Sequence, residues 1–179
     1  IPAIGSAIAK SLQQDPYWKP FFDGFPPIRQ WLSEVKPDVA VVFYNDHGLN
    51  FFLDKMPTFA VGAAPEYRNA DEGWGIPTLP PIQGCVDLSW QIIDHLIERE
   101  FDIVTCQEML VDHACTIPLK LFWPQETCPV RIVPVNLNTV ETNQRLLIVA
   151  VNSLTQVLKV GFANTYPISI PVAIDNLGT

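Results

Sequence analysis

A short apolar run that ends in a histidine constrains the fold of this chain more than any other part of its sequence. Residues 39–43 have the composition of a buried β-strand, and Tyr-Asn-Asp-His follows directly at positions 44–47. Strands that are apolar on both faces are typical of sheets covered by helices on both sides. Ligands of such α/β folds bind beyond the carboxyl ends of the strands, which makes His47 a candidate metal ligand or acid/base. A capping or core histidine, satisfied by Asp46 or by the backbone, is the alternative.

Patterns of helix and strand alternate along the rest of the chain. Apolar spacing predicts helices over residues 28–35 and 87–100, the second with Asp87 as its N-cap. Strands are predicted over residues 39–44, 57–62, 101–105, 130–135 and 168–174. Residues 64–81 have the composition of a long loop, and residues 144–160 show mixed helical periodicity.

This alternation predicts an α/β fold of three layers with a mainly parallel central sheet. The 179 residues are enough for one domain, and we expect residues 1–179 to form a single α/β domain. The strands over residues 39–43, 101–105 and 130–135 are expected to be neighbours in its core. The helix over residues 87–100 is expected to cover one face.

Charge, cysteine content and hydropathy bound the class of protein. The formal net charge is -8 and the eleven Lys and Arg are scattered, which argues against nucleic acid as a partner. The four cysteines show no close pairing, so we expect free thiols in a cytoplasmic protein. No apolar stretch reaches the ~20 residues that a membrane helix requires, so no membrane partner is expected. With 48% hydrophobic and 17% charged residues, we expect a buried interface in a homo-oligomer or with a small-subunit partner.

A second candidate is His113, which follows Val111 and Asp112 in the turn between a strand and a new helical segment. Asp112 need not touch the histidine beside it, because it could equally cap a helix or brace a neighbouring loop. Both histidines follow strands whose ends should open on one cleft, so we expect His47 and His113 to converge in space. His95 lies within a predicted helix and is given no role.

The segment at residues 71–75, Asp-Glu-Gly-Trp-Gly, is expected to be an ordered loop that lines the site or a subunit interface. Trp74 between two glycines combines a large contact surface with a permissive backbone. A loop anchored by the burial of Trp74 alone is the alternative. The sequence offers the carboxylates of Asp46, Asp71, Glu72 and Asp112 but places none of them near His47.

Five sequence strings, in this order, resemble those of class III extradiol ring-cleaving dioxygenases, as in the catalytic subunits of protocatechuate 4,5-dioxygenase and gallate dioxygenase. The strings lie at residues 1–5, 44–47, 57–62, 70–75 and 111–113, and the resemblance is dense to about residue 140. The strings at residues 48–57 and 106–110 are nearer to the gallate branch.

The resemblance implies Fe(II) held by two histidines and one glutamate, with the catechol oxygens and dioxygen at the open positions. His47 matches the second iron-binding histidine. His113 matches the acid/base histidine near the substrate hydroxyl, where an imidazole can accept a phenolic proton and later return it. The implied partners are an aromatic catechol acid and dioxygen.

In the family, the first iron-binding histidine precedes the string found here at residues 1–5, and the glutamate ligand and a second active-site histidine follow the string found at residues 177–179. We therefore expect the N-terminal part of a larger dioxygenase catalytic domain. Residues 141–163 depart from the family pattern. Residues 1–179 alone are expected to show little catalysis, because a lone imidazole cannot hold Fe(II) against water.

Three classes of function stay open. The parent protein is a ring-cleaving enzyme acting on gallate or protocatechuate, or a non-catalytic relative that keeps the fold for binding or assembly, or a protein that shares the scaffold only. We favour the first. The sequence does not distinguish gallate from protocatechuate, which differ by one hydroxyl.

Overall fold

The structure is a computed structural model that describes residues 2–52, 54–55, 57–73 and 75–137. The segment of mixed helical periodicity at residues 144–160 and the strand predicted over residues 168–174 lie outside the described residues. The elements follow in the order α1 (Pro2–Ala9), η1 (Leu12–Gln14), α2 (Lys19–Phe22), α3 (Phe25–Val35), β1 (Val39–Asn45), β2 (Phe59–Gly62), β3 (Glu66–Asn69), β4 (Ile82–Gln83), α4 (Val86–Ile97), β5 (Val104–Cys106), β6 (Leu110–Val111), α5 (His113–Phe122) and β7 (Arg131–Leu137).

The larger sheet has the strand order β1-β7-β2-β5. Strands β1 and β7 pair in parallel over their full lengths, from Val39 with Arg131 to Asn45 with Leu137. Strands β2 and β5 are also parallel, whereas β2 and β7 are antiparallel. The expected α/β fold with a mainly parallel sheet is confirmed, with one antiparallel pairing at its centre.

The expected order of the core strands is only partly right. Strand β1 lies next to β7, as predicted, but β5 pairs with β2 and does not contact β7 as a neighbour. The reason is that β2 is an interior strand, buried along Ala60, Val61 and Gly62, and takes the place beside β7. The predicted strand over residues 101–105 is also displaced, because regular pairing begins only at Val104.

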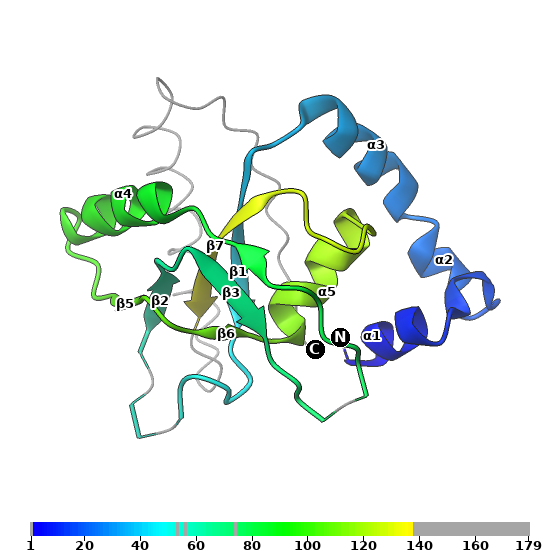
Figure 1. Cartoon of the computed structure of the whole chain (residues 1–179), viewed down its shortest axis with the longest axis horizontal. Helices are drawn as coiled ribbons and strands as arrows, with labels where there is room; N and C mark the ends of the chain where they lie inside the picture. Colours follow the sequence, from blue (N-terminus) through cyan, green and yellow to red (C-terminus); the bar gives the residue numbers. More distant parts are fainter. Residues whose placement is uncertain (1, 53, 56, 74, 138–179) are drawn as a thin grey trace.

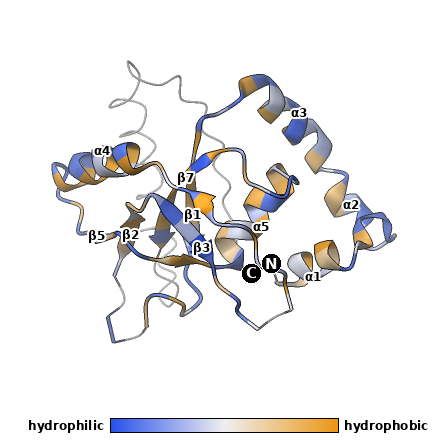
Figure 2. Cartoon of the chain, in the orientation of Figure 1, coloured by the Kyte–Doolittle hydropathy of each residue, from blue (hydrophilic) through white to orange (hydrophobic). Residues whose placement is uncertain are grey.

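Helices cover both faces of the sheet, which gives the three expected layers (Figure 1). Side chains alternate along β1, so that Phe43 packs in the cluster under α4 while Ala40 and Tyr44 pack in the cluster under α5. Hydrophobic and hydrophilic residues alternate around α4 (Figure 2), whose Leu88 and Ile92 are buried against the sheet. A third cluster joins α1 and α2 to the outer side of α5.

A smaller sheet, in the order β4-β3-β6, crosses the segment that was expected to be a long loop. The prediction of a loop over residues 64–81 is therefore wrong at residues 66–69. Only Tyr67 is fully buried in this four-residue strand, between polar neighbours, so its alternation is too short to stand out in the sequence. Gly84 bridges to Ile132 and links the smaller sheet to β7.

Helix α4 begins one residue earlier than predicted, at Val86, with Cys85 in the N-cap position. The prediction of Asp87 as N-cap is therefore wrong. Asp87 lies in the first turn, where its negative charge interacts favourably with the helix dipole.

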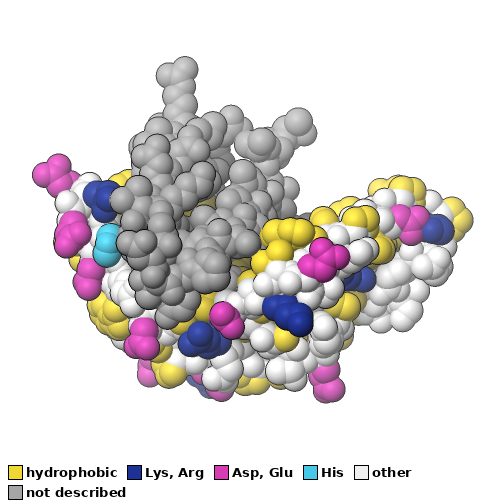
Figure 3. Space-filling view, turned by 90° about the horizontal axis from the view of Figure 1, so that it is seen from above, with side chains coloured by type: hydrophobic (Ala, Val, Ile, Leu, Met, Phe, Trp, Pro, Cys, Tyr) yellow, Lys and Arg dark blue, Asp and Glu magenta, His cyan; other side chains and the backbone are white. Residues whose placement is uncertain are grey.

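Three further features of the described residues are the state of the cysteines, the distribution of basic side chains and the length of the helices. The four cysteines are free thiols. Lys and Arg side chains on the face drawn in Figure 3 lie apart from one another and form no continuous stripe over the described residues. None of the helices in the described part of the chain is long and apolar enough to span a bilayer.

Candidate metal and acid/base site

The loop that follows β1 is organised by Asp46, which is buried. Its carboxylate accepts the backbone N–H groups of Leu49 at 2.9 Å and of Asn50 and Phe51 at 3.0 to 3.1 Å. The amide of Asn50 then pairs with the backbone of Leu110 in both directions, at 2.9 and 3.0 Å. These bonds fasten the loop to the start of β6. As a result, His47 is held beside residues 110–113.

Asp112 joins this loop to helix α5. It is the N-cap of α5, and its Oδ1 accepts the N–H groups of Ala114 at 2.8 Å and Cys115 at 3.3 Å. Its Oδ2 accepts the backbone N–H of His47 at 3.1 Å and lies 2.9 Å from Nδ1 of the same residue. An ionised carboxylate offers about four lone-pair sites, and four donors fill them here. Asp112 therefore braces His47 and has no acceptor site to spare for a metal.

The ring of His47 is fixed by a hydrogen bond and is still partly exposed to solvent. Because an ionised carboxylate can only accept, Nδ1 of His47 carries the proton and donates a hydrogen bond to Asp112, so Nε2 is the unprotonated nitrogen of the neutral ring. The side chain is 43% exposed. The hydrogen bond to Asp112 raises the pKa of His47 above its usual value; desolvation opposes this, and the charges of Asp112, Glu72 and Asp46 add to it. A histidine whose Nδ1 is held by a carboxylate is the usual arrangement of a metal-binding histidine.

His113 opens helix α5 and is buried, with a carboxylate of its own. Its Nδ1 lies 2.8 and 2.9 Å from the two oxygens of Glu72, and its backbone N–H donates to Glu72 at 2.7 Å. The ring centroids of His47 and His113 are 4.6 Å apart, with the planes at 32°. The expected convergence of the two histidines is confirmed.

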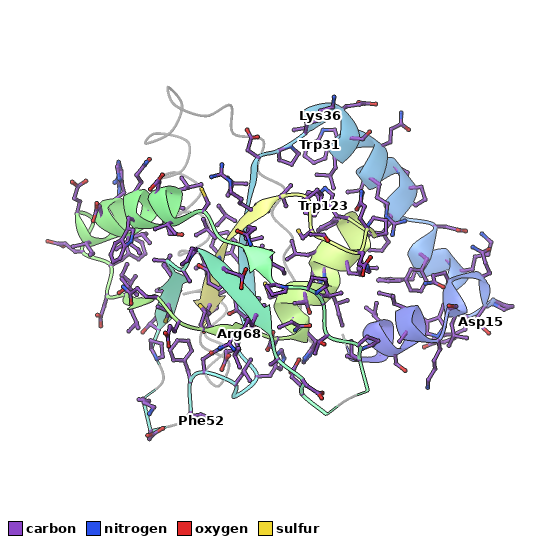
Figure 4. All side chains as sticks on the ribbon, in the orientation of Figure 1. Asp15, Trp31, Lys36, Phe52, Arg68 and Trp123 are labelled. Carbon is purple, nitrogen blue, oxygen red and sulfur yellow. The ribbon has the colours of Figure 1, made fainter. Side chains whose placement is uncertain are left out.

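The potential ligand atoms of His47, Asp112 and His113 all lie within 4.8 Å of one another. A small pocket beside His113 is lined by Asn69, Ala70, Glu72, Ile76, His113 and Thr116. Figure 4 labels two residues of the neighbouring segments, Arg68 on β3 and Phe52 on the loop that follows β1.

The other residues considered for the site, Asp46, Asp71, Trp74 and His95, are not part of the two histidine–carboxylate pairs. Asp46 accepts backbone N–H groups of its own loop, and the carboxylate that holds His47 is that of Asp112. Asp71 accepts the N–H of Gly73 in a local turn. The segment at residues 71–75 reaches the site through Glu72, while Trp74 lies outside the described residues. His95 bonds to Gln91 within α4, as expected for a histidine without a role.

The residues that the sequence failed to place are the two carboxylate partners. Asp112 pairs with His47 across 65 positions, and Glu72 pairs with His113 across 41. No local pattern marks either pairing. The signal that could have found Glu72 is strand β3, whose pairing with β6 sets Asn69 opposite Val111 and brings the two segments together.

Comparison with known proteins identifies the class of protein that this fold and site belong to. Residues 1–154 match the family described as the catalytic LigB subunit of aromatic ring-opening dioxygenase. The chain belongs to this family, and the resemblance to class III extradiol dioxygenases is thereby confirmed.

Two relatives are enzymes named 2,3-dihydroxyphenylpropionate/2,3-dihydroxicinnamic acid 1,2-dioxygenase. The one from Comamonas testosteroni is 30% identical over 112 residues, which cover 63% of this chain and 34% of the relative. The one from Mycolicibacterium gilvum is 33% identical over 118 residues, which cover 64% and 35%. The matched part thus spans about a third of the length of these relatives.

Among solved structures, a putative methylthioadenosine nucleosidase from Weissella paramesenteroides is similar with a TM-score of 0.45 and 13% identity, covering 78% of this chain and 75% of that one. A likeness of this degree carries no argument about function.

Proposed function

We propose that the full-length protein carrying this chain opens the ring of a catechol-type aromatic acid, beside its two hydroxylated carbons, with dioxygen and Fe(II). The observation that carries this proposal is the pair of His47 and Asp112. Asp112 holds Nδ1 of His47 and leaves Nε2 available, which is the geometry of a metal ligand. Membership of the ring-opening dioxygenase family supports the same conclusion.

The donor chemistry of the described residues fits a non-haem iron site in part. Imidazole nitrogen is a suitable ligand for Fe(II), and His47 offers one. By the resemblance, a second histidine and a glutamate complete the ligand set from positions outside residues 1–179. When bound, such an iron brings the catechol and dioxygen together on one ion and passes electron density between them.

His113 is the proposed acid/base. Glu72 occupies its Nδ1, so Nε2 is the nitrogen left to accept a proton from a substrate hydroxyl and to return it later. The ring lies 4.6 Å from that of His47, so a hydroxyl bound beside the metal would be within reach of either residue. Burial of His113 keeps bulk water from competing for this proton.

The substrate is proposed as a class, a catechol that carries a carboxylate. Gallate and protocatechuate follow from the sequence resemblance, and 2,3-dihydroxyphenylpropionate follows from the names of the relatives. All three acids belong in the test.

The test compares two variants in the full-length protein, with iron content by elemental analysis and oxygen uptake with each acid. His47→Ala should lose iron, because the remaining ligands no longer define the site. His113→Ala should keep iron but turn over about 10²–10⁴-fold more slowly. His95→Ala, on the far helix α4, is the control and should behave as wild type. Equal iron loss in both site variants would make His113 a ligand, and unchanged oxygen uptake in both would overturn the proposal.

A further inference from the structure

The two histidines of the site are built into the fold in the same way. In each case one carboxylate accepts both the backbone N–H and the ring Nδ1–H of a single histidine: Asp112 for His47, and Glu72 for His113. Asp112 also caps helix α5, whereas the side-chain hydrogen bonds that Glu72 makes to described residues all go to His113. The side chain of Glu72 is 15% exposed, so the contact is shielded from solvent.

We propose that Glu72 is a positioning residue that fixes the tautomer of His113. Its carboxylate holds the ring as the Nδ1–H form, which leaves Nε2 unprotonated and turned away from Glu72. The catalytic consequence rests on the proposed acid/base function of His113, whereas the tautomer itself does not.

The backbone explains how Glu72 reaches His113. Strands β3 and β6 run in parallel with Asn69 opposite Val111, and the N–H of Ala70 continues the pairing to the carbonyl of Val111 at 3.0 Å. The chain leaving β3 therefore stays alongside the chain that enters α5. Gly73, at a φ of 74°, then turns the chain away directly after Glu72. The amide of Asn69 fastens the return of this loop through the N–H of Leu79 at 2.9 Å.

Both contacts of Glu72 require an acceptor. The backbone N–H of His113 can only donate, and it lies at the start of α5, where N–H groups lack partners within the helix. The imidazole is different, because its Nδ1 donates in one tautomer and accepts in the other. An ionised carboxylate accepts only, so it selects the donating form.

The substitution Glu72→Gln separates these two contacts without a change of size. The amide of glutamine has one acceptor and one donor group. The backbone N–H can only donate, so the glutamine oxygen stays at the place of Oε2, 2.7 Å from that nitrogen. The NH₂ group then takes the place of Oε1, 2.8 Å from Nδ1 of His113, where a donor faces a ring nitrogen that has to accept. The ring then becomes the Nε2–H form, and the nitrogen proposed to accept the substrate proton is blocked.

The experiment measures ¹⁵N chemical shifts of histidine side chains in metal-free, histidine-labelled full-length protein above neutral pH, with His113→Asn used to assign the signal. Wild type should show His113 as Nδ1–H, and Glu72→Gln should show it as Nε2–H. Glu66→Gln, at an exposed position on β3, is the matched control and should change no histidine signal. An Nε2–H form of His113 in wild type, or no change in Glu72→Gln, would overturn the proposal.

Oxygen uptake distinguishes this proposal from the proposed function. Glu72→Gln should lower kcat by about 10–100-fold with KM little changed, and the double variant with His113→Ala should be no slower than His113→Ala alone. Normal turnover with an inverted tautomer would overturn the positioning role while the enzyme function stands. If Glu72→Gln inverts the tautomer but the wild-type protein cleaves no catechol, the enzyme function is overturned and the tautomer assignment stays in place.

Discussion

Asp112 bonds to His47, 65 positions before it, through both the backbone and the ring of that residue. The same carboxylate starts helix α5. The orientation of His47 and the start of α5 are therefore set by one buried group. A change that loosens either one disturbs the other.

Replacing Asp112 by Asn should lower the free energy of unfolding by about 2–4 kcal/mol, measured by urea denaturation. The amide of asparagine offers one acceptor oxygen where four N–H donors now converge on two, and its own NH₂ group would face donors. Asp94→Asn, at an exposed position on α4, is the control. A difference below about 0.5 kcal/mol between the two variants would contradict the description of Asp112 as a buried brace.

Metal binding should weaken as the pH falls through the raised pKa of His47. The hydrogen bond to Asp112 favours the protonated ring, and a metal must displace that proton to reach the nitrogen. Affinity should fall by about tenfold per pH unit once His47 is protonated. Anaerobic equilibrium dialysis with Fe(II) between pH 5.5 and 8 measures this; an affinity that does not change over this range would argue against His47 as a ligand. The folding stability of the metal-free protein should change with pH in the opposite direction to its metal affinity. The raised pKa of His47 adds folding stability below pH 6.5, the pKa of the unfolded chain, and this contribution is lost as the pH rises through the pKa of the folded protein.

The folded protein should lose stability between pH 10 and pH 12, in part through Tyr67. Burial raises the pKa of Tyr67 from 10.0 to about 12, so over this range the unfolded chain releases a proton that the folded chain keeps. Between pH 8 and pH 11, Tyr67→Phe should reduce this alkaline loss by about 1–2 kcal/mol. At pH 8 the same variant should be less stable by about 1–2 kcal/mol, because the N–H of Ala64 loses the hydroxyl that accepts it at 3.0 Å.

Thermal or urea unfolding at pH 8 and pH 11 tests both parts of this prediction. Tyr17→Phe is the matched control, because Tyr17 is exposed. An equal alkaline loss in Tyr67→Phe and wild type would contradict the role of Tyr67.

Gly84→Ala should destabilise the protein by about 3 kcal/mol. A Cβ at this position would lie 2.0 Å from the carbonyl oxygen of Ala64 and 2.9 Å from the ring of Tyr67, so the backbone that links the two sheets would have to move. Gly24→Ala, whose nearest neighbour would lie at 3.4 Å, is the control. Chemical denaturation of the two variants measures the difference, and equal stabilities would show that the contact at Gly84 relaxes easily.

Strand β1, which leads to His47, could be predicted because five consecutive apolar residues mark it, and such a run indicates a buried strand whatever strands lie beside it. The order of the strands could not, because β2 is as apolar as β5 and both fit beside β7. Strand β3 was missed for a different reason. It has a single fully buried residue, Tyr67, and one residue is too few to show the alternation of apolar and polar positions that marks a strand.

The histidines of the site were found from their places after strands, whereas their partners were not. Carboxylate pairing depends on which loops meet, and here the meeting depends on Asn50 docking on Leu110 and on β3 lying beside β6. Asp46 and Asp112 both precede histidines in sequence, yet their carboxylates bond elsewhere. Adjacency in sequence was therefore no guide to the dyads.

The insertion of β7 between β1 and β2 has a consequence for synthesis on the ribosome. Strand β2 ends at Gly62, and β7 begins at Arg131, roughly 70 residues later. At translation rates of about 5–20 residues per second, β1 and β2 are made several seconds before β7, the strand that pairs with both of them. Two apolar edges left unpaired for that time are a natural substrate for a nascent-chain chaperone, and yield in the cell should depend on one.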